Sequence, residues 1–115
     1  VVLDFWASWC GPCLASLPLV AEVAGEFAED GVELVAVNLG ERPPQVQELL
    51  ERQQWNELTV ALDRVGEVAA KFAVEAIPQT VVIDREGRVA RLFVGGGPAL
   101  EAPLREALAE LTARP

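Results

Sequence analysis

The chain has 115 residues, of which 51% are hydrophobic and 23% charged, with a formal net charge of −9 and no histidine. This length can bury one hydrophobic core without metals or cross-links, and the composition is typical of a globular domain. Its nine lysines and arginines are spread singly, and no apolar run approaches the roughly 18 residues needed to cross a bilayer, so neither nucleic acid nor membrane contact by this chain is expected.

Along the chain, the spacing of apolar residues changes repeatedly between strand-like and helix-like. Residues 1–6 form an apolar run interrupted only by Asp4, as expected for a central strand covered on both faces. Residues 13–29 carry apolar side chains at helical spacing, and Pro18 is expected to bend that helix. A second buried strand is predicted at residues 32–39.

The alternation continues in the second half of the chain. A proline pair predicts a helix start before "QVQELLERQQ", and a third strand is predicted at residues 58–62. A further short helix is marked by Val65, Val68, Ala69 and Phe72. The segments "QTVVID" and "RVARLFV" flank "REG", which predicts a β-hairpin with Gly87 in the left-handed conformation. The last helix has Pro103 near its first turn and an apolar side formed by Leu100, Leu104, Leu108 and Leu111.

This order of elements predicts an α/β fold with a mixed central sheet and helices on both faces. No internal linker is visible, so residues 1–115 are expected to form a single domain. Because the chain opens directly in a buried strand, we expect further sequence upstream of Val1 in the parent protein.

Both cysteines lie in "WASWCGPCLASLP", residues 6–18. Two thiols without a histidine do not complete a four-ligand zinc site, so no metal is expected unless a second chain contributes ligands. A disulfide between Cys10 and Cys13 would close a very short loop and would stabilise the fold little. Thiol-disulfide exchange uses this spacing, because the second thiol can resolve a mixed disulfide formed by the first. Since a helix is predicted to begin near Cys10, we expect that thiol to be exposed and partly ionised, and Cys13 to be the more buried, resolving thiol.

The segment "VLDFWASWCGPC" closely resembles the active-site strand and turn of thioredoxins, and "KFAVEAIPQTVVID" with "REGRV" resembles the cis-proline segment of that family. Pro78 follows Cys13 by 65 positions, more than in a plain thioredoxin, and the excess corresponds to one strand-helix unit within residues 32–55. In this respect the chain is similar to the TlpA/ResA branch of exported or membrane-tethered thiol-disulfide oxidoreductases. It departs from that branch in lacking the N-terminal hairpin region and in carrying Asp4 where asparagine is more frequent.

The apolar neighbours of Asp4 indicate that its carboxyl is buried with a raised pKa, although a solvated carboxylate at a sheet edge is the alternative. The resemblance implies that Asp4 exchanges a proton with Cys13. It also implies a cis bond between Ile77 and Pro78 beside Cys10, where the backbone of residue 77 would pair with an extended substrate; an ordinary trans proline is the alternative. The residues assigned to substrate binding on this basis are Trp9, Gly11, Pro12, Ile77, Pro78, Val94 and Gly95.

The resemblance implies a thioredoxin-like protein-disulfide reductase without a bound cofactor. Its expected partners are a disulfide-containing protein substrate and an upstream thiol electron donor, and the chain is expected to be monomeric. Export to the periplasm or tethering to a membrane is expected, with a cytoplasmic location as the alternative. One alternative is a redox-inactive or redox-sensing module of a larger protein. A peroxiredoxin-like peroxidase is a second alternative, but the sequence lacks a lone cysteine in a Pro/Thr setting and an arginine near the cysteine pair that would support it.

Overall fold

The computed structural model describes residues 1–113, which form one five-stranded sheet with surrounding helices. The strands are β1 (Val2–Trp6), β2 (Leu34–Leu39), β3 (Val60–Asp63), β4 (Gln79–Ile83) and β5 (Val89–Val94). The helices are α1 (Gly11–Gly25), α2 (Pro43–Gln53), α3 (Glu67–Lys71) and α4 (Glu101–Thr112), with short 3-10 helices at Ala28–Asp30 and Pro98–Leu100. The predicted order of elements is confirmed, although β2 and β3 each begin two residues later than predicted.

The sheet is mixed, as predicted, and has the strand order β3-β2-β1-β4-β5. β1, β2 and β3 run parallel, whereas β4 runs antiparallel to both β1 and β5. The carboxyl ends of the three parallel strands therefore meet at one edge of the sheet, where β4 begins and β5 ends. We call this the carboxyl edge, and its loops comprise residues 7–10, 40–42, 64–66, 77–78 and 95–97.

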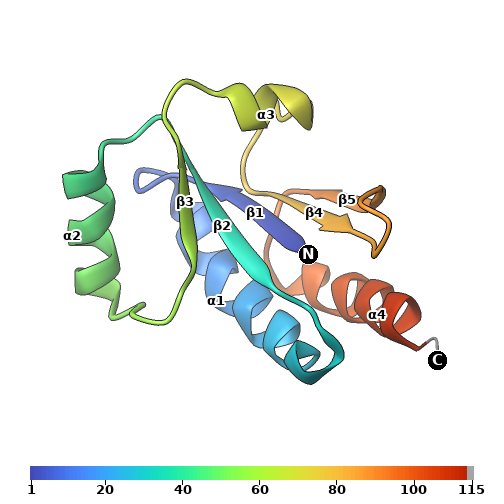
Figure 1. Ribbon diagram of the computed structural model, residues 1–115. Helices are drawn as coiled ribbons and strands as arrows, with labels where there is room; N and C mark the ends of the chain where they lie inside the picture. The colour runs from blue at the N-terminus through green and yellow to red at the C-terminus, as the bar shows by residue number, and fades with distance from the viewer. Residues whose placement is uncertain (114–115) are drawn as a thin grey trace.

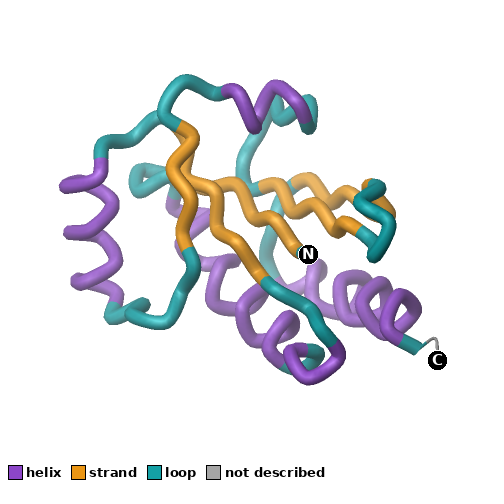
Figure 2. The backbone as a smooth tube through the Cα atoms, viewed as in Figure 1, coloured by secondary structure: helices purple, strands orange, loops and turns teal. Residues whose placement is uncertain are grey.

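Helices cover both faces of the sheet, but unequally. α1 and α4 lie side by side on one face (Figure 1), and α2 joins that face through Val46 and Leu49, which pack in the same cluster as Leu17 of α1. The opposite face is covered by the five-residue α3 and the segment after it, where Phe72 packs against Phe5 of β1. The tube view shows the same division (Figure 2). Along the chain, two strand-helix units, β2-α2 and β3-α3, lie between α1 and β4. The additional strand-helix unit predicted within residues 32–55 is therefore present.

Helix α1 ends earlier than its apolar periodicity predicts. The pattern predicts a helix as far as Glu29, but α1 continues through Pro18 and ends at Gly25. Beyond this point the backbone tightens, because the N–H of Phe27 donates to the carbonyl oxygen of Ala24 at 3.0 Å, an i to i−3 bond. Apolar spacing alone does not detect the end of the α-helix, since the helical spacing of apolar residues continues to Phe27, directly before the 3-10 helix.

The prediction that Val65 belongs to the third helix is wrong, because Val65 lies in the turn before α3 and is 79% exposed. The carboxylate of Asp63 accepts hydrogen bonds from the N–H groups of Val68 and Ala69 at 3.2 and 2.9 Å. Gly66 has the left-handed φ of 80°, which reverses the chain before the helix. Together these features start α3 after Gly66 and leave Val65 outside it.

The hairpin between β4 and β5 is confirmed. Gly87 has a φ of 83°, and its N–H donates to the carbonyl oxygen of Asp84 at 3.1 Å. The carboxylate of Asp84 also accepts hydrogen bonds from the backbone N–H groups of Glu86 and Arg88 at 2.9 and 3.0 Å. These hydrogen bonds satisfy backbone N–H groups of the turn that joins β4 to β5.

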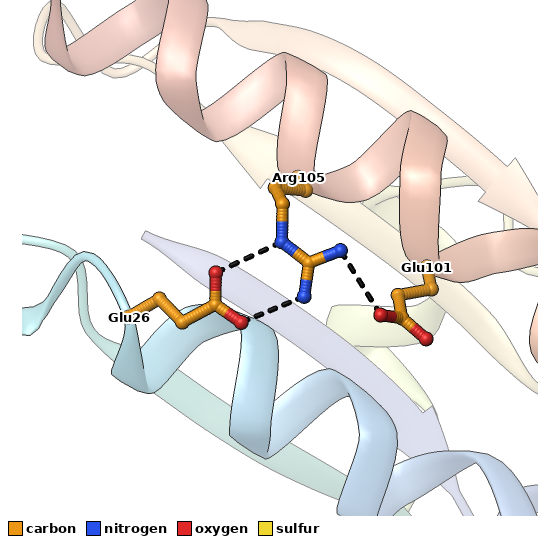
Figure 3. Close-up of polar contacts among 3 residues, drawn as sticks. All are labelled: Glu26, Glu101 and Arg105. Carbon is orange, nitrogen blue, oxygen red and sulfur yellow. Dashed lines mark hydrogen bonds and ion pairs between the residues drawn. The ribbon is translucent and has the colours of Figure 1, made fainter.

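Two ion pairs share Arg105, and one of them links α4 to the end of α1 (Figure 3). The Arg105 guanidinium donates to both carboxylate oxygens of Glu26, at 2.8 and 2.7 Å, and to Glu101 one turn earlier at 3.0 Å. The hydrogen bond from Arg105 lowers the pKa of Glu26.

The apolar side predicted for the last helix is confirmed, because Leu100, Leu104 and Leu108 are buried. Within residues 1–113 no helix is long and apolar enough to span a membrane.

Candidate active site

The two cysteines lie at the start of α1, on the carboxyl edge of the sheet. A hydrogen bond from the N–H of Cys10 to the carbonyl oxygen of Ala7, at 3.1 Å, closes the turn that leads from β1 into α1. Cys10 is the N-cap residue, and its sulfur is bonded to that of Cys13, with 5.2 Å between the two Cα atoms. The N–H of Cys13 donates to Sγ of Cys10 at 3.2 Å. Because the helix start supplies this donor and a partial positive charge, it favours a thiolate at Cys10 in the reduced chain.

The prediction that Cys10 is exposed is wrong for this disulfide-bonded state. Cys10 is 5% exposed and Cys13 is 1% exposed, so Cys10 is the more accessible of the two but still buried. The reason is that the sulfur of Cys10 is bonded inward to Cys13, within the hydrophobic cluster beneath the start of α1. The exposed surface around the pair is provided by Trp9, which is 73% exposed, and by Gly11 and Pro12.

Asp4 is buried, as predicted, and lies in the middle of β1. Val2 and Trp6, its neighbours on the same face of the strand, both pack in clusters with α1, so the Asp4 side chain also lies on the α1 face. The hydroxyl of Thr80 donates to its carboxylate at 3.3 Å. Burial raises the pKa of Asp4 from 3.8 to about 7, and the Thr80 hydrogen bond offsets this only in part. The carboxyl therefore changes its protonation near neutral pH, which suits a group that exchanges protons.

The peptide bond between Ile77 and Pro78 is cis, as the resemblance implies. Ile77 packs against the cluster that contains both cysteines. The N–H of Gly95 donates to the carbonyl oxygen of Pro78 at 2.8 Å, and Val94, which is exposed, pairs in register with the first residue of β4. The cysteine pair, the cis-proline and the Gly95 loop are thus brought together along the carboxyl edge.

Sequence reasoning missed the contact between Gly96 and α1. A Cβ atom on Gly96 would lie 2.6 Å from Oγ of Ser16 and 3.1 Å from Cγ of Pro78. Ser16 lies one turn after Cys13 and is buried, with no hydrogen-bond partner for its hydroxyl. Glycine at position 96 therefore allows the loop of residues 95–97 to approach both α1 and Pro78. The run of three glycines was the available signal, because consecutive glycines often mark a close backbone approach.

A second residue missed from the sequence is Glu41, which is buried in the loop after β2. Its carboxylate accepts hydrogen bonds from Ser8, in the turn before Cys10, and from Asn38 at the end of β2. No local pattern relates Glu41 to Ser8, since 33 positions separate them.

Among residues 1–113 no group of three or more His, Cys, Asp or Glu side chains is placed to hold a metal ion. A groove of about 990 Å³ lies between α1 and the loop of residues 54–59. It contains neither cysteine and opens at the amino end of β2, so it is separate from the carboxyl edge.

The Redoxin family model matches residues 1–108 of this chain. Thiol-disulfide oxidoreductase ResA of Bacillus subtilis (strain 168) is 36% identical over 95 residues, which are 83% of this chain and 52% of ResA. ResA of Geobacillus thermodenitrificans (strain NG80-2) is 34% identical over 95 residues, or 83% of this chain and 54% of that protein. The chain thus spans about half the length of the curated relatives it matches.

Among solved structures, a chain from Chlorobium tepidum described as a candidate thiol:disulfide interchange protein DsbE superimposes with a TM-score of 0.88. It is 35% identical, and the match covers 96% of this chain and 78% of that one. The thioredoxin fold expected from the sequence is confirmed by this superposition and by the mixed five-stranded sheet.

Proposed function

This chain belongs to the Redoxin family, and from that premise we propose that it is a thiol-disulfide oxidoreductase that reduces protein disulfides through Cys10 and Cys13. The observation that carries the proposal is the placement of the chain's two cysteines at the N-terminal end of α1, within bonding distance, with the N–H of Cys13 directed at Sγ of Cys10. The similarity to proteins named thiol-disulfide oxidoreductase supports the same assignment.

In the proposed reaction the Cys10 thiolate attacks one sulfur of a substrate disulfide. A mixed disulfide forms, and the second substrate sulfur leaves as a thiolate that is protonated by solvent. Cys13 then loses its proton and attacks Sγ of Cys10, which forms the intrachain disulfide and releases the first substrate sulfur. Two electrons pass from the cysteine pair to the substrate, and an external thiol reductant returns the pair to the dithiol.

Asp4 is the proposed acceptor of the Cys13 proton. A thiolate at Cys13 is costly because this side chain is 1% exposed, and solvent bases have little access to it. The Asp4 carboxyl lies on the α1 face of β1, beneath the helix that carries Cys13, and burial places its pKa at about 7. A group with this pKa can take up a proton and return it near neutral pH.

The proposed substrate is an extended polypeptide segment that binds across the carboxyl edge. Trp9, which precedes Cys10, and Val94, at the end of β5, provide exposed apolar surface at the carboxyl edge, and Gly11 and Pro12 are exposed between the two cysteines. The backbone of Ile77, just before the cis-proline, is the proposed strand-addition site for this segment. Residues 78 and 95, joined by a backbone hydrogen bond, close the surface on the β5 side.

The remaining parts of the proposal concern the cellular setting. The chain is proposed to act as a monomer outside the cytoplasm, exported or tethered to a membrane through sequence beyond this chain, as its similarity to the TlpA/ResA branch implies. An upstream thiol protein is the proposed electron donor. Thiol-disulfide exchange requires no bound cofactor.

The test is the dithiothreitol-driven reduction of insulin, followed by turbidity. The wild-type chain is expected to accelerate the reaction, and Cys10→Ser is expected to abolish the acceleration. If the wild-type chain cycles between dithiol and disulfide but does not accelerate insulin reduction, it is a redox-sensing module and the proposal is wrong. If it instead consumes hydrogen peroxide with dithiothreitol, it is a peroxidase.

A further inference from the structure

The turn that carries Trp9 into Cys10 is fixed by a carboxylate from a distant part of the chain. The Ser8 N–H donates to Oε1 of Glu41 at 2.7 Å, and the Ser8 hydroxyl donates to Oε2 of the same side chain. The turn is closed on its other side by the hydrogen bond from Cys10 to Ala7. Both oxygens of one carboxylate are therefore used to hold a single residue two positions before Cys10.

Glu41 is itself held firmly. The Asn38 side-chain amide donates to Oε1 of Glu41 at 2.8 Å, and Asn38 lies opposite Trp6 in the register between β1 and β2. The N–H of Gly40 donates to the carbonyl oxygen of Asp63 at 3.0 Å, which attaches the same loop to the end of β3. The loop after β2 is thus hydrogen-bonded both to the last residue of β3 and to the turn that follows β1.

Glu41 is only 7% exposed, so its contacts are made in a largely dry environment. Burial alone would raise its pKa, but the hydrogen bonds from Ser8 and Asn38 outweigh this effect and hold the pKa below its usual value. The side chain is consequently a carboxylate at neutral pH and accepts hydrogen bonds without donating any. Hydrogen bonds to a charged acceptor are roughly twice as strong as neutral ones, which makes this a rigid connection.

We propose that Glu41 is a positioning residue for the redox reaction: it fixes the turn of residues 7–10 so that Sγ of Cys10 faces the N–H of Cys13. This inference rests on the function proposed above. The contact between Sγ and the helix start is what favours a thiolate at Cys10, and it depends on the N-cap geometry of that residue. Without the Glu41 carboxylate the turn loses its hydrogen bonds to the loop after β2, and the thiolate loses part of its stabilisation.

A purely electrostatic role for Glu41 predicts the opposite sign. A nearby negative charge disfavours a thiolate, so removing the charge would lower the pKa of Cys10, whereas loosening the turn would raise it. The two roles are therefore separated by the direction in which the pH profile of Cys10 moves.

The experiment measures the rate of iodoacetamide alkylation of Cys10 in the reduced chain from pH 5 to pH 9. For Glu41→Gln we expect the midpoint to move to higher pH, with alkylation slowed about fivefold at pH values below the midpoint, as for loss of a favourable helix-terminus contact. Ser8→Ala, which keeps the charge of Glu41 and removes one of the two hydrogen bonds to Ser8, should move the midpoint in the same direction by less. The rate constant for insulin reduction should fall with the thiolate fraction in both variants.

Asp63→Asn is the matched control. Asp63 is also a buried carboxylate that accepts two hydrogen bonds, but its donors are the N–H groups of Val68 and Ala69 in α3, not the turn before Cys10. The backbone carbonyl of Asp63 that accepts the Gly40 N–H is unchanged by this substitution, so the variant should lose stability without moving the alkylation midpoint. An unchanged or lowered midpoint in Glu41→Gln, or an equal shift in Asp63→Asn, would overturn the positioning role. If Glu41→Gln does not fold, Ser8→Ala decides, and an unchanged midpoint there overturns it as well. Alkylation does not require turnover. Failure of the wild-type chain to reduce insulin would therefore refute the proposed function, whereas the alkylation midpoints would still test the positioning role of Glu41.

Discussion

Replacing Asp4 by asparagine should destabilise the folded protein at acid pH and stabilise it at alkaline pH. The folded protein binds a proton at Asp4 more tightly than the unfolded chain does, because burial raises the pKa of this carboxyl from 3.8 to about 7. Its contribution is therefore most favourable below about pH 4 and becomes unfavourable as the pH rises through 7. Asparagine has the same shape and does not titrate, so the variant should show no such loss.

The magnitude follows from the same pKa values. Ionising Asp4 in the folded protein costs about 4 kcal/mol relative to the unfolded chain, since one pKa unit corresponds to about 1.4 kcal/mol. The amide of asparagine can still accept the Thr80 hydrogen bond, but its new N–H group is left without a partner at a cost of about 1–3 kcal/mol. Asp4→Asn should thus be less stable than wild type near pH 4 and more stable by about 1–3 kcal/mol at pH 8.

The assay is urea unfolding of both oxidised proteins at pH 4, 5, 6, 7 and 8. The difference in free energy of unfolding between variant and wild type should increase by about 1.4 kcal/mol per pH unit below pH 7 and then level off. Glu86→Gln, which removes an exposed carboxylate from the β4–β5 turn, is the control and should change the free energy of unfolding little. A constant difference for Asp4→Asn across this range would show that Asp4 is not a buried carboxyl titrating near pH 7.

Turnover provides the second half of the same test. If Asp4 takes the proton of Cys13, Asp4→Asn should slow insulin reduction most strongly at about pH 7 to 8, where wild-type Asp4 is a carboxylate and little Cys13 thiolate forms unaided. The slowing should be smaller at pH 5, because Asp4 is protonated there and is not a base in the wild type either. A variant that gains stability at pH 8 but keeps the wild-type pH profile of turnover would make Asp4 a structural residue only.

Three further predictions concern the cysteines, the glycine loop and the ion pair. Cys13→Ser should trap a mixed disulfide with a substrate protein and Cys10→Ser should not, as read by non-reducing electrophoresis; adducts with Cys10→Ser alone would reverse the assigned roles. Gly96→Ala should lower the urea-unfolding stability by about 1–3 kcal/mol because the new methyl group meets Ser16, and Ser16→Gly in the same chain should recover part of that loss; additive losses in the double variant would contradict the contact. Arg105→Met should lower the melting temperature slightly at low salt and hardly at all at 1 M salt, since its contacts to Glu26 and Glu101 are exposed; a large loss that persists in salt would show that the packing of its stem dominates.

The sequence by itself determined the features that depend on neighbours along the chain. Apolar spacing of two or of three to four residues distinguished strands from helices, and this was sufficient to order the elements and to predict the mixed sheet. The turn at Gly87 was predicted from the left-handed position that glycine alone adopts readily. The cysteine spacing favoured thiol-disulfide exchange as the hypothesis, because two thiols one helical turn apart can form and break a single disulfide, and the structure joins the two cysteines in this way. The cis bond before Pro78 came from the family resemblance and not from any periodicity.

Only the tertiary structure decided which distant residues meet at the carboxyl edge. Glu41 reaches Ser8 across 33 positions because the parallel pairing of β1 and β2 brings their carboxyl ends together. Gly96 meets Ser16 because β5 ends beside the start of α1. The burial of Cys10 likewise depends on the cluster beneath it, and the exposure of Val65 depends on the cap that Asp63 supplies to α3. Local periodicity reports which side of an element faces a core, whereas these contacts depend on how the elements pack, and a single sequence does not contain that information in any short segment.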